Sequence, residues 1–279
     1  MLAAASADGT AAVWDMTGGE LLYTLAGHSS QLWAVAFSPD SRMVATASLD
    51  GTIDVTYSPD GTRLATAGTD AIAKVWDTAT GEELLALAGH TDGLLSVAYS
   101  PDGQFIAASS SEEYTNVKVW DAVTGEEIHT LEGHIANVWG LAFSRDNRLL
   151  VTGGFGGEVK LWEMATGAEL YTVPSQVSTV ATVILTPDEE RLITGGGDAV
   201  RVWDVATGTE VLTLANRSGR IDLTQDGHRL YVGSRDGVVR VYALPLEDTI
   251  SLAHTRLTRT LTEQEGQQYL HVDTCPAGQ

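Results

Sequence analysis

A short turn of the form Ser/Thr-x-Asp returns at a nearly constant interval, and this repeat limits what the chain can fold into more than any other feature. The copies start at Ser38, Ser58, Ser100, Ser144, Thr186 and Thr224, which puts them 20, 42, 44, 42 and 38 residues apart. A period of about 40 to 45 residues is typical of stacked, structurally equivalent units, each of which buries its apolar face against its neighbours. The sequence therefore predicts a repeat protein rather than one continuous sheet.

The clearest copy of the unit, residues 60–102, predicts four short strands. Its apolar runs, residues 63–68, 72–76, 83–87 and 94–99, have strand length and are rich in alternating or β-branched side chains. The residues between the runs favour tight turns, because Pro presets φ, Gly adopts positive φ, and Asp and Thr bond to their own backbone. We expect an all-β chain built from four-stranded antiparallel units.

The unit between Ser38 and Ser58 is about 22 residues shorter than the others. Near residues 49–58 it lacks the Trp-Asp strand, the Thr-Gly turn and the Gly-His corner that neighbouring units carry. The segment Thr52–Ser58 has its apolar residues in the same positions as residues 94–100. Because register decides which face a side chain takes, this segment is predicted to be the first strand of the next unit. One unit has then lost two strands.

Two dipeptides recur in register with the turns. Gly-His occurs at residues 27–28, 89–90 and 133–134, and Trp-Asp at residues 14–15, 76–77, 120–121 and 203–204, with Trp-Glu at residues 162–163. On these motifs the sequence resembles the WD-repeat β-propeller family over residues 2–244. The resemblance implies a ring of blades, each with an inner strand a at a central channel and strands b, c and d outside it. The fold expected is an all-β, WD-repeat-like β-propeller of six to seven blade positions, four complete and the others partial, with a short helical C-terminal tail.

The blades implied by this resemblance differ in completeness. Residues 53–88, 94–132, 137–173 and 178–214 supply four strands each, and residues 219–243 supply three. Residues 2–6, 10–15 and 20–26 correspond to strands b, c and d of a blade without strand a, and residues 31–38 and 43–48 to strands a and b of the short unit. In the family an amino-terminal outer strand usually completes the last blade. If residues 20–26 do this, the ring has six positions; if they stay in their own blade, it has seven.

After residue 244 the apolar period changes from that of a strand to that of a helix. One helical face carries Leu246, Ile250, Ala253 and Leu257. Thr262 and Glu265 then form a capping box that starts a second short helix. We therefore expect two domains, a propeller in residues 1–244 and a helical extension in residues 245–279.

This extension resembles the tail of some bacterial WD-repeat proteins, in which the propeller follows signalling NTPase, kinase or regulator domains. Where those tails carry a cysteine this chain has Gly266, so the resemblance implies no disulfide or metal site for Cys275, the one cysteine of the sequence. The resemblance also raises an alternative for the whole chain, a degenerate or truncated fragment of a multidomain bacterial signalling protein.

The charge balance excludes several kinds of partner. The sequence has 16 Lys and Arg against 37 Asp and Glu, a net charge of −21, which repels nucleic-acid phosphates and anionic lipids. A single cysteine cannot form an internal disulfide. The amino terminus has neither a basic start nor an apolar run long enough for export or membrane insertion. We expect a cytoplasmic protein with no nucleic-acid or membrane partner.

The resemblance implies a buried network in each blade that links the corner His, a strand-b Ser or Thr, an Asp after strand b and the strand-c Trp. The candidates are His28, Ser48 and Asp50; Asp70 and Trp76; His90, Ser110 and Trp120; His134, Thr152 and Trp162; and Asp198 and Trp203. Since such networks satisfy buried polar groups, we assign these residues a structural role and no catalytic one. The Asp residues of the turns lack the clustering of a calcium loop, so we predict no metal and no cofactor.

One loop, residues 110–116, is longer than its counterparts, and in the family's geometry it lies on the same face as the Gly-His corners, the top face. Tyr114, flanked by acidic residues, would be an aromatic anchor for a protein or peptide partner, and the acidic rim suits a basic one. The candidate partner-binding residues are Asp92, Glu112, Glu113, Tyr114, Asn137 and Trp139. Trp33 and Trp139, on inner strands, are expected to pack between blades or, alternatively, to line the channel mouth.

Three functional hypotheses follow. The first is a non-catalytic scaffold or sensor that binds its partner through the top face, and the second is the signalling fragment described above. The third, a propeller enzyme, is disfavoured because the sequence has no Ser-His-Asp order, no Gly-rich phosphate loop and no cysteine pair. The incomplete blades leave open strand edges, which invite self-association.

Overall fold

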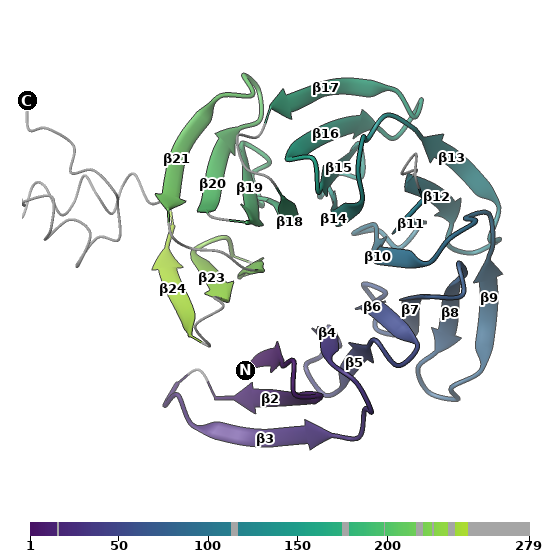
Figure 1. Cartoon of the computed structure of the whole chain (residues 1–279), viewed down its shortest axis with the longest axis vertical. Helices are drawn as coiled ribbons and strands as arrows, with labels where there is room; N and C mark the ends of the chain where they lie inside the picture. Colours follow the sequence, from purple (N-terminus) through teal and green to yellow (C-terminus); the bar gives the residue numbers. More distant parts are fainter. Residues whose placement is uncertain are drawn as a thin grey trace, which may run out of the picture.

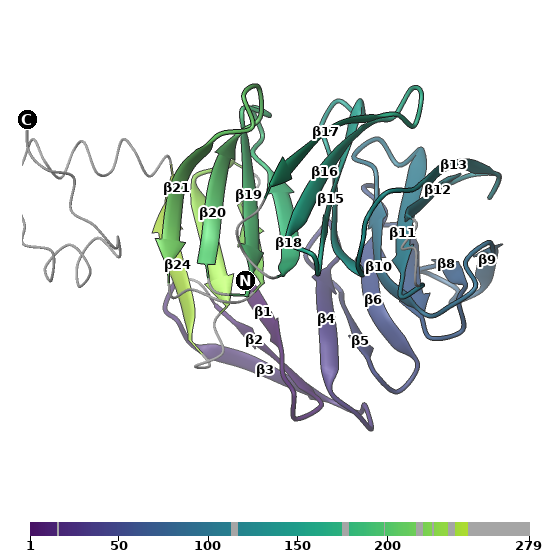
Figure 2. The ribbon, with the colours of Figure 1, turned by 45° about the horizontal axis from the view of Figure 1, so that its top comes forward.

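The computed structural model describes residues 1–15, 17–112, 117–174, 179–197, 199–215, 220–224, 226–233 and 238–244. These residues form twenty-four strands, β1 to β24, and the described part of the chain contains no helix. The strands make seven antiparallel sheets that follow one another around a common axis in chain order (Figure 1). In the tilted view the inner strands β4, β6, β10 and β18 stand around this axis (Figure 2).

Four sheets are complete blades of four strands. They are β6 (Thr52–Tyr57), β7 (Arg63–Gly68), β8 (Ala73–Asp77) and β9 (Glu83–Leu87); β10 (Leu94–Tyr99), β11 (Phe105–Ser110), β12 (Val117–Asp121) and β13 (Glu127–Leu131); β14 (Val138–Phe143), β15 (Leu149–Gly154), β16 (Glu158–Glu163) and β17 (Glu169–Pro174); and β18 (Val180–Leu185), β19 (Arg191–Gly196), β20 (Ala199–Asp204) and β21 (Glu210–Ala215).

The other three sheets are smaller. Three strands form the first sheet, β1 (Leu2–Ala5), β2 (Thr10–Trp14) and β3 (Leu21–Ala26), and the last one, β22 (Ile221–Leu223), β23 (Arg229–Gly233) and β24 (Val239–Ala243). The sheet of β4 (Leu32–Phe37) and β5 (Val44–Ser48) has two strands, and we call it the half-blade. The chain is thus an all-β, six-bladed β-propeller, counting the blades of three or four strands, with the half-blade between the first and second of them. The predicted fold class is confirmed.

The recurring turn connects strands a and b in the half-blade and in every blade except the first, which has no strand a, and its side chains explain why it recurs. In the best copy, Ser58 donates its hydroxyl hydrogen to Asp60 (2.6 Å) and accepts from the amide of Arg63 (2.9 Å). Asp60 also accepts from the amide of Thr62 (3.0 Å), and Gly61 has a φ of 73°. A hydroxyl at the first position and a carboxylate at the third thus close the turn at every copy, with the same bond at Ser38, Ser100, Ser144, Thr186 and Thr224.

Strand pairing around the half-blade answers the questions that the sequence left open. Strand β6 pairs with β7, with Val55 opposite Thr66, so the short unit does re-enter the repeat on an inner strand. Strand β3, within residues 20–26, pairs with β2 and completes the first blade, so it does not complete the last one. In the described part of the chain β24 pairs with β23 alone, and the ring has seven positions.

The hydrophobic core lies between neighbouring blades. One cluster joins blade β6–β9 to blade β10–β13 and contains Leu87, Ile106 and Trp120, none more than 1% exposed. Similar clusters join the blades that follow. At the half-blade the cluster is reduced to the small buried residues Ala34, Ala47 and Val55. The loss of strands c and d therefore leaves this part of the ring with a thinner core.

Residues 245–279, with the predicted helical extension and Cys275, lie outside the described residues. In the described ranges, no helix has the length and apolar character needed to cross a membrane.

Candidate functional site

The top face is the side of the ring where each inner strand begins and each strand b ends. There the corners before strand a meet the turns between strands b and c. The amide of Leu49 donates to the carbonyl of Gln31 (3.1 Å), and the amide of Phe155 donates to the carbonyl of Asn137 (2.7 Å). Each b–c turn is therefore fixed against the corner of its own blade, and side chains of both segments share one surface.

Under this surface the structure brings three of the predicted network residues together. The hydroxyl oxygen of Thr152 lies 2.6 Å from Nε2 of His134 and accepts a hydrogen bond from Nε1 of Trp162 (2.8 Å). Burial lowers the pKa of His134 to about 4, and the nearby ammonium of Lys160 acts in the same direction. The imidazole is therefore neutral at pH 7, which fits a structural role.

Two further blades keep the Trp–Thr part of the network. Nε1 of Trp76 donates to Thr66 (2.9 Å), and Nε1 of Trp203 donates to Thr194 (3.0 Å). Asp70 accepts a hydrogen bond from Lys74 (2.7 Å) on the exposed side of its blade. Asp198, the remaining candidate of this group, lies outside the described residues.

The strand-b hydroxyl in contact with the histidine is not at the predicted position. Nε2 of His28 lies 2.9 Å from Thr46 Oγ1, whereas the predicted Ser48 accepts from the amide of Asp50 (3.3 Å) in its own turn. Both residues face the same side of the strand, and the imidazole reaches past the nearer one. The predicted link from Nδ1 of His28 to Asp50 is present, at 3.0 Å.

The same offset applies to the predicted Ser110. The position equivalent to Thr46 is Ala108, which has no hydroxyl, and Nε2 of His90 lies 3.3 Å from its backbone carbonyl. The hydroxyl of Ser110 accepts instead from the amide of Glu112 (3.4 Å). Trp120 packs edge-on against His90, with ring centroids 5.8 Å apart. Burial lowers the pKa of His90, so this imidazole too is neutral near pH 7.

The predicted partner-binding residues separate into different environments. Asp92 is exposed at its corner, while the carboxylate of Glu112 accepts a hydrogen bond from the amide of Thr91 and so ties the b–c turn to that corner. Asn137 contributes its backbone carbonyl to the corner of the next blade. Glu113 and Tyr114 lie outside the described residues.

Trp139 lies in the channel, stacked on Trp33. The two ring centroids are 5.2 Å apart and the ring planes differ by 21°, although strands β4 and β14 belong to sheets that two complete blades separate. Each tryptophan stands where the pairing of its inner strand with strand b shifts register, and such a bulge re-aims a side chain. The two rings therefore pack on each other, although their strands belong to sheets that are not neighbours, and this differs from the expected packing between adjacent blades.

Three exposed apolar residues of the top face were not found by sequence reasoning. Ile135 is 74% exposed at a corner, Phe155 (54%) is exposed in a b–c turn, and Leu49 (43%) is exposed in the turn from β5 to β6, which takes the place of a b–c turn in the half-blade. The two turns are bonded to the segments that precede Trp139 and Trp33. Comparison of the repeats position by position would have found them, because Thr69 and Thr91 occupy the equivalent places elsewhere. We call Leu49, Trp33, Trp139, Phe155 and Ile135 the top-face stripe.

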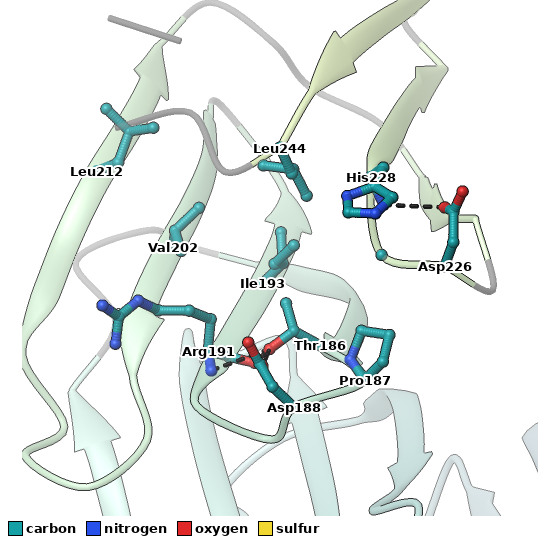
Figure 3. Close-up of a pocket in the computed structure, with 11 residues that line it drawn as sticks. Thr186, Pro187, Asp188, Arg191, Ile193, Val202, Leu212, Asp226, His228 and Leu244 are labelled. Atoms are coloured by element: carbon teal, nitrogen blue, oxygen red, sulfur yellow. Dashed lines mark hydrogen bonds between the residues drawn. The ribbon is translucent and has the colours of Figure 1, made fainter. Parts of the chain in front are cut away.

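A cavity of about 250 Å³ lies between blades β18–β21 and β22–β24, at the a–b turns (Figure 3). Ile193, Val202, Leu212 and Leu244 make much of its wall. Its two carboxylates are engaged within their own turns, Asp188 by the hydroxyl of Thr186 and Asp226 by the amide of His228. The described residues contain no group of three or more His, Cys, Asp or Glu that could hold a metal ion. The cavity is thus an apolar gap beside the incomplete last blade.

These features define the class of the protein as a β-propeller with a buried His–Thr–Trp network beneath its top face. A family model described as WD domain, G-beta repeat, matches residues 19–55, 53–77, 81–121 and 125–163. The chain belongs to the WD40-repeat β-propeller family, whose members typically serve as protein-interaction scaffolds and are generally non-catalytic.

Known proteins that resemble this chain match it over short stretches. It is 38% identical over 55 residues to the WD repeat-containing protein SL1-17 of Schistosoma mansoni, which covers 20% of this chain and 18% of that protein. It is 45% identical over 49 residues to the U5 small nuclear ribonucleoprotein 40 kDa protein of Pongo abelii, covering 18% of this chain and 14% of that protein. With the pre-mRNA-processing factor 19 homolog 2 of Arabidopsis thaliana it shares 40% identity over 55 residues, 20% of this chain and 10% of that protein. The matches thus span less than a fifth of each relative.

Proposed function

We propose that the chain is a non-catalytic scaffold or sensor module that binds a protein or peptide through its top face. The observation that carries this proposal is the top-face stripe, in which the side chains of Ile135, Phe155 and Leu49 are exposed and the rings of Trp33 and Trp139 stack on each other. Burial of one such exposed side chain by a partner would contribute roughly 1.5 to 3 kcal/mol. Apolar side chains of this size are the usual anchors of an interface.

The charges around the stripe favour a basic partner segment. Asp50 and Asp92 lie at the corners and turns of the top face, and the whole chain carries a net charge of −21. Such a field speeds association with a positively charged partner and disfavours an acidic one. The partner proposed is a protein segment with one or two large apolar residues flanked by Lys or Arg, met in the cytoplasm. Tyr114, as an aromatic anchor, and the neighbouring acidic residue Glu113 remain part of this proposal.

The experiment compares the two faces of the ring by photo-crosslinking. A photoreactive amino acid replaces Ile135 on the top face or, as the matched control, Val123, which is 66% exposed in the turn between β12 and β13 on the opposite face. We expect a distinct crosslinked partner from position 135 that Phe155→Asp abolishes. Crosslinks from position 123 alone, or insensitive to Phe155→Asp, would disprove the top-face site.

The internal half-blade favours a second candidate function. A repeat that has lost two strands is what a degenerate segment of a larger signalling protein, with an NTPase or kinase region, would contain. In that case residues 1–244 and the extension 245–279 would act with domains encoded by a neighbouring reading frame. Co-expression with such a frame should then raise the melting temperature of this chain. An unchanged melt together with a monomeric mass by light scattering would favour the independent scaffold.

A further inference from the structure

The outer edge of β5 is an unpaired strand edge in the wall of the ring. Among the described strands β5 pairs with β4 alone. Met43 accepts from the amide of Ser38, and Leu49 donates to Gln31, so these residues point their backbone groups toward β4. Because hydrogen bonds of antiparallel strands alternate in direction, Val44 and Thr46 point theirs outward. The backbone amide and carbonyl groups of these two residues therefore have no partner strand among the described strands.

The next blade shows what normally covers these positions. There Leu64 and Thr66, the counterparts of Val44 and Thr46, are paired with strand β8, opposite Trp76 and Lys74. The indole of Trp76 donates to the hydroxyl of Thr66. At the half-blade the hydroxyl of Thr46 contacts His28 but meets no tryptophan among the described residues. The edge therefore lacks a strand with a hydrogen-bond donor at the Trp position.

Side chains beside this edge are exposed where their equivalents are buried. Leu25 in β3 is 38% exposed, whereas Leu87, Leu131 and Leu214 at the same place in other blades are at most 1% exposed. The side chain of His28 is 28% exposed, against 0% for His90 and 1% for His134. The apolar side chain of Leu25 and the imidazole of His28 are thus left partly exposed beside the open backbone of β5.

The shape of the ring disfavours pairing of the β5 edge with the same edge of a second copy of the chain. Strands β3 and β9 are the outermost strands of the sheets on either side, and β5 lies inside them (Figure 1). Two recessed edges cannot approach each other, so symmetric pairing of β5 with β5 is blocked. A projecting hairpin, about the length of the 22 residues that the short unit lacks, can enter.

Charge complementarity specifies the occupant further. In blade β6–β9 the acid of the b–c turn, Asp70, forms an ion pair with Lys74 of strand c at 2.7 Å. Asp50 is its counterpart at the half-blade. Strand c carries a basic residue two positions before its tryptophan in all four complete blades, at Lys74, Lys118, Lys160 and Arg201. In the other three blades this basic residue pairs with a glutamate of strand d, at Glu127, Glu169 and Glu210. The Lys74–Asp70 pair shows that the same position can also reach the turn acid, so a hairpin with this feature can place a cation beside Asp50.

We propose that the open edge of β5 binds a β-hairpin of a partner protein, whose first strand carries Lys or Arg two residues before a Trp and whose second strand is apolar. The hairpin would extend the half-blade to four strands, pair with Val44 and Thr46, and cover Leu25 and His28. The open edge lies in the wall of the ring and adjoins the top-face stripe at Leu49 and Asp50, but its binding rests on Val44, Thr46 and Leu25, which the top-face site does not use, so either proposal can fail without the other.

The test uses the full chain and a synthetic peptide with the sequence of residues 72–89, the c–d hairpin of the next blade. Fluorescence anisotropy should show saturable binding. In the peptide, Trp76→Ala should weaken binding about tenfold, because an indole and its hydrogen bond are lost. Lys74→Glu should weaken it about two- to fivefold, the range of an exposed ion pair. These changes leave the folding of the protein untouched, so no binding, or equal binding of all three peptides, overturns the proposal.

The location is tested with an edge substitution. Val44→Pro removes an amide hydrogen that points outward and leaves the bonds to β4 in place, so it should weaken binding about tenfold, whereas Val44→Thr should bind like the unaltered chain. Hydrogen exchange should show that the peptide slows exchange at Val44 and Thr46. Protection confined to another strand edge, such as that of β1, would overturn the assignment to β5 even if the peptide binds.

Discussion

Trp33 and Trp139 stack on each other across the channel with their ring centroids 5.2 Å apart, so the half-blade is held to a blade on the far side of the ring. This contact joins two segments that share no strand pairing and no turn. The half-blade has a thin core against its neighbour, and the stack gives it a second point of attachment. The two indole nitrogens are buried without a partner in the described part of the chain, so packing rather than hydrogen bonding carries the contact.

A double-mutant cycle should detect this attachment. Trp33→Leu and Trp139→Leu each remove one half of the stack, and the second substitution should cost less stability when the first is already present. Aromatic pairs couple by about 0.5 to 1.5 kcal/mol beyond their buried area, so we expect a coupling energy of that size in urea unfolding. Strict additivity of the two free-energy changes would show that the stack contributes nothing of its own.

The hydroxyl of Thr152 should be worth more than that of Thr194. The hydroxyl of Thr152 bonds to both His134 and Trp162, whereas that of Thr194 bonds to Trp203 alone among the described residues. Replacement by Val keeps the shape and removes the hydroxyl. Each group left without a partner costs roughly 1 to 3 kcal/mol, so Thr152→Val should lower the free energy of unfolding by about twice as much as Thr194→Val. Chemical denaturation of the two variants checks the order, and a larger effect at Thr194 would contradict the network described here.

The repeat was readable from the sequence because its signals are local. Turns such as Ser58 to Gly61 are closed by their own side chains, so their spacing reports the blades directly. The return of the pattern at Thr52 likewise predicted that β6 is an inner strand, as its pairing with β7 confirms. The loss of strands c and d from one unit could therefore be predicted from the sequence alone.

Features that depend on distant contacts could not be predicted in this way. Nothing near Trp33 indicates that its partner is Trp139, because the stack depends on the closure of the whole ring and on two bulges. The choice of Thr46 over Ser48 as the contact of His28 depends on how far the imidazole reaches across the strand, and both residues have the same side-chain chemistry. Family motifs indicate that a network exists but not which of two hydroxyls completes it.

The stability of the chain should fall between pH 6.5 and pH 4 because of His134. Burial lowers the pKa of this imidazole to about 4 in the folded state, against an ordinary value of 6.5. The unfolded chain therefore binds more protons in this window, and stability that is fully present above pH 6.5 is lost as the pH falls toward 4. The shift corresponds to about 3 kcal/mol. His90, whose pKa is also lowered by burial, changes stability in the same direction.

Unfolding free energies measured with urea at several pH values in this window test the assignment. In His134→Asn the slope against pH should become shallower, whatever the loss of stability at pH 7. The lowered pKa values of the turn carboxylates, such as Asp60, affect stability at more acidic pH, because their ordinary value is already 3.8. An unchanged slope would mean that His134 is accessible to protons in the folded chain.

A missing hydroxyl offers the sharpest test of the network, because it can be added. Blade β10–β13 has the corner His90 and the strand-c Trp120, but Ala108 stands where Thr152 and Thr46 supply the hydroxyl elsewhere. Ala108→Thr should give Nε2 of His90 a side-chain partner and raise the free energy of unfolding by about 1 kcal/mol. The control is Ala107→Thr, a neighbour that is equally buried but points to the opposite side of the sheet. There the added hydroxyl faces away from His90 and gains no such partner, so the larger side chain should lower stability by about 1 to 3 kcal/mol. If both variants lose stability, the small side chain of Ala108 is required for packing in this blade, and an added hydroxyl does not complete the network.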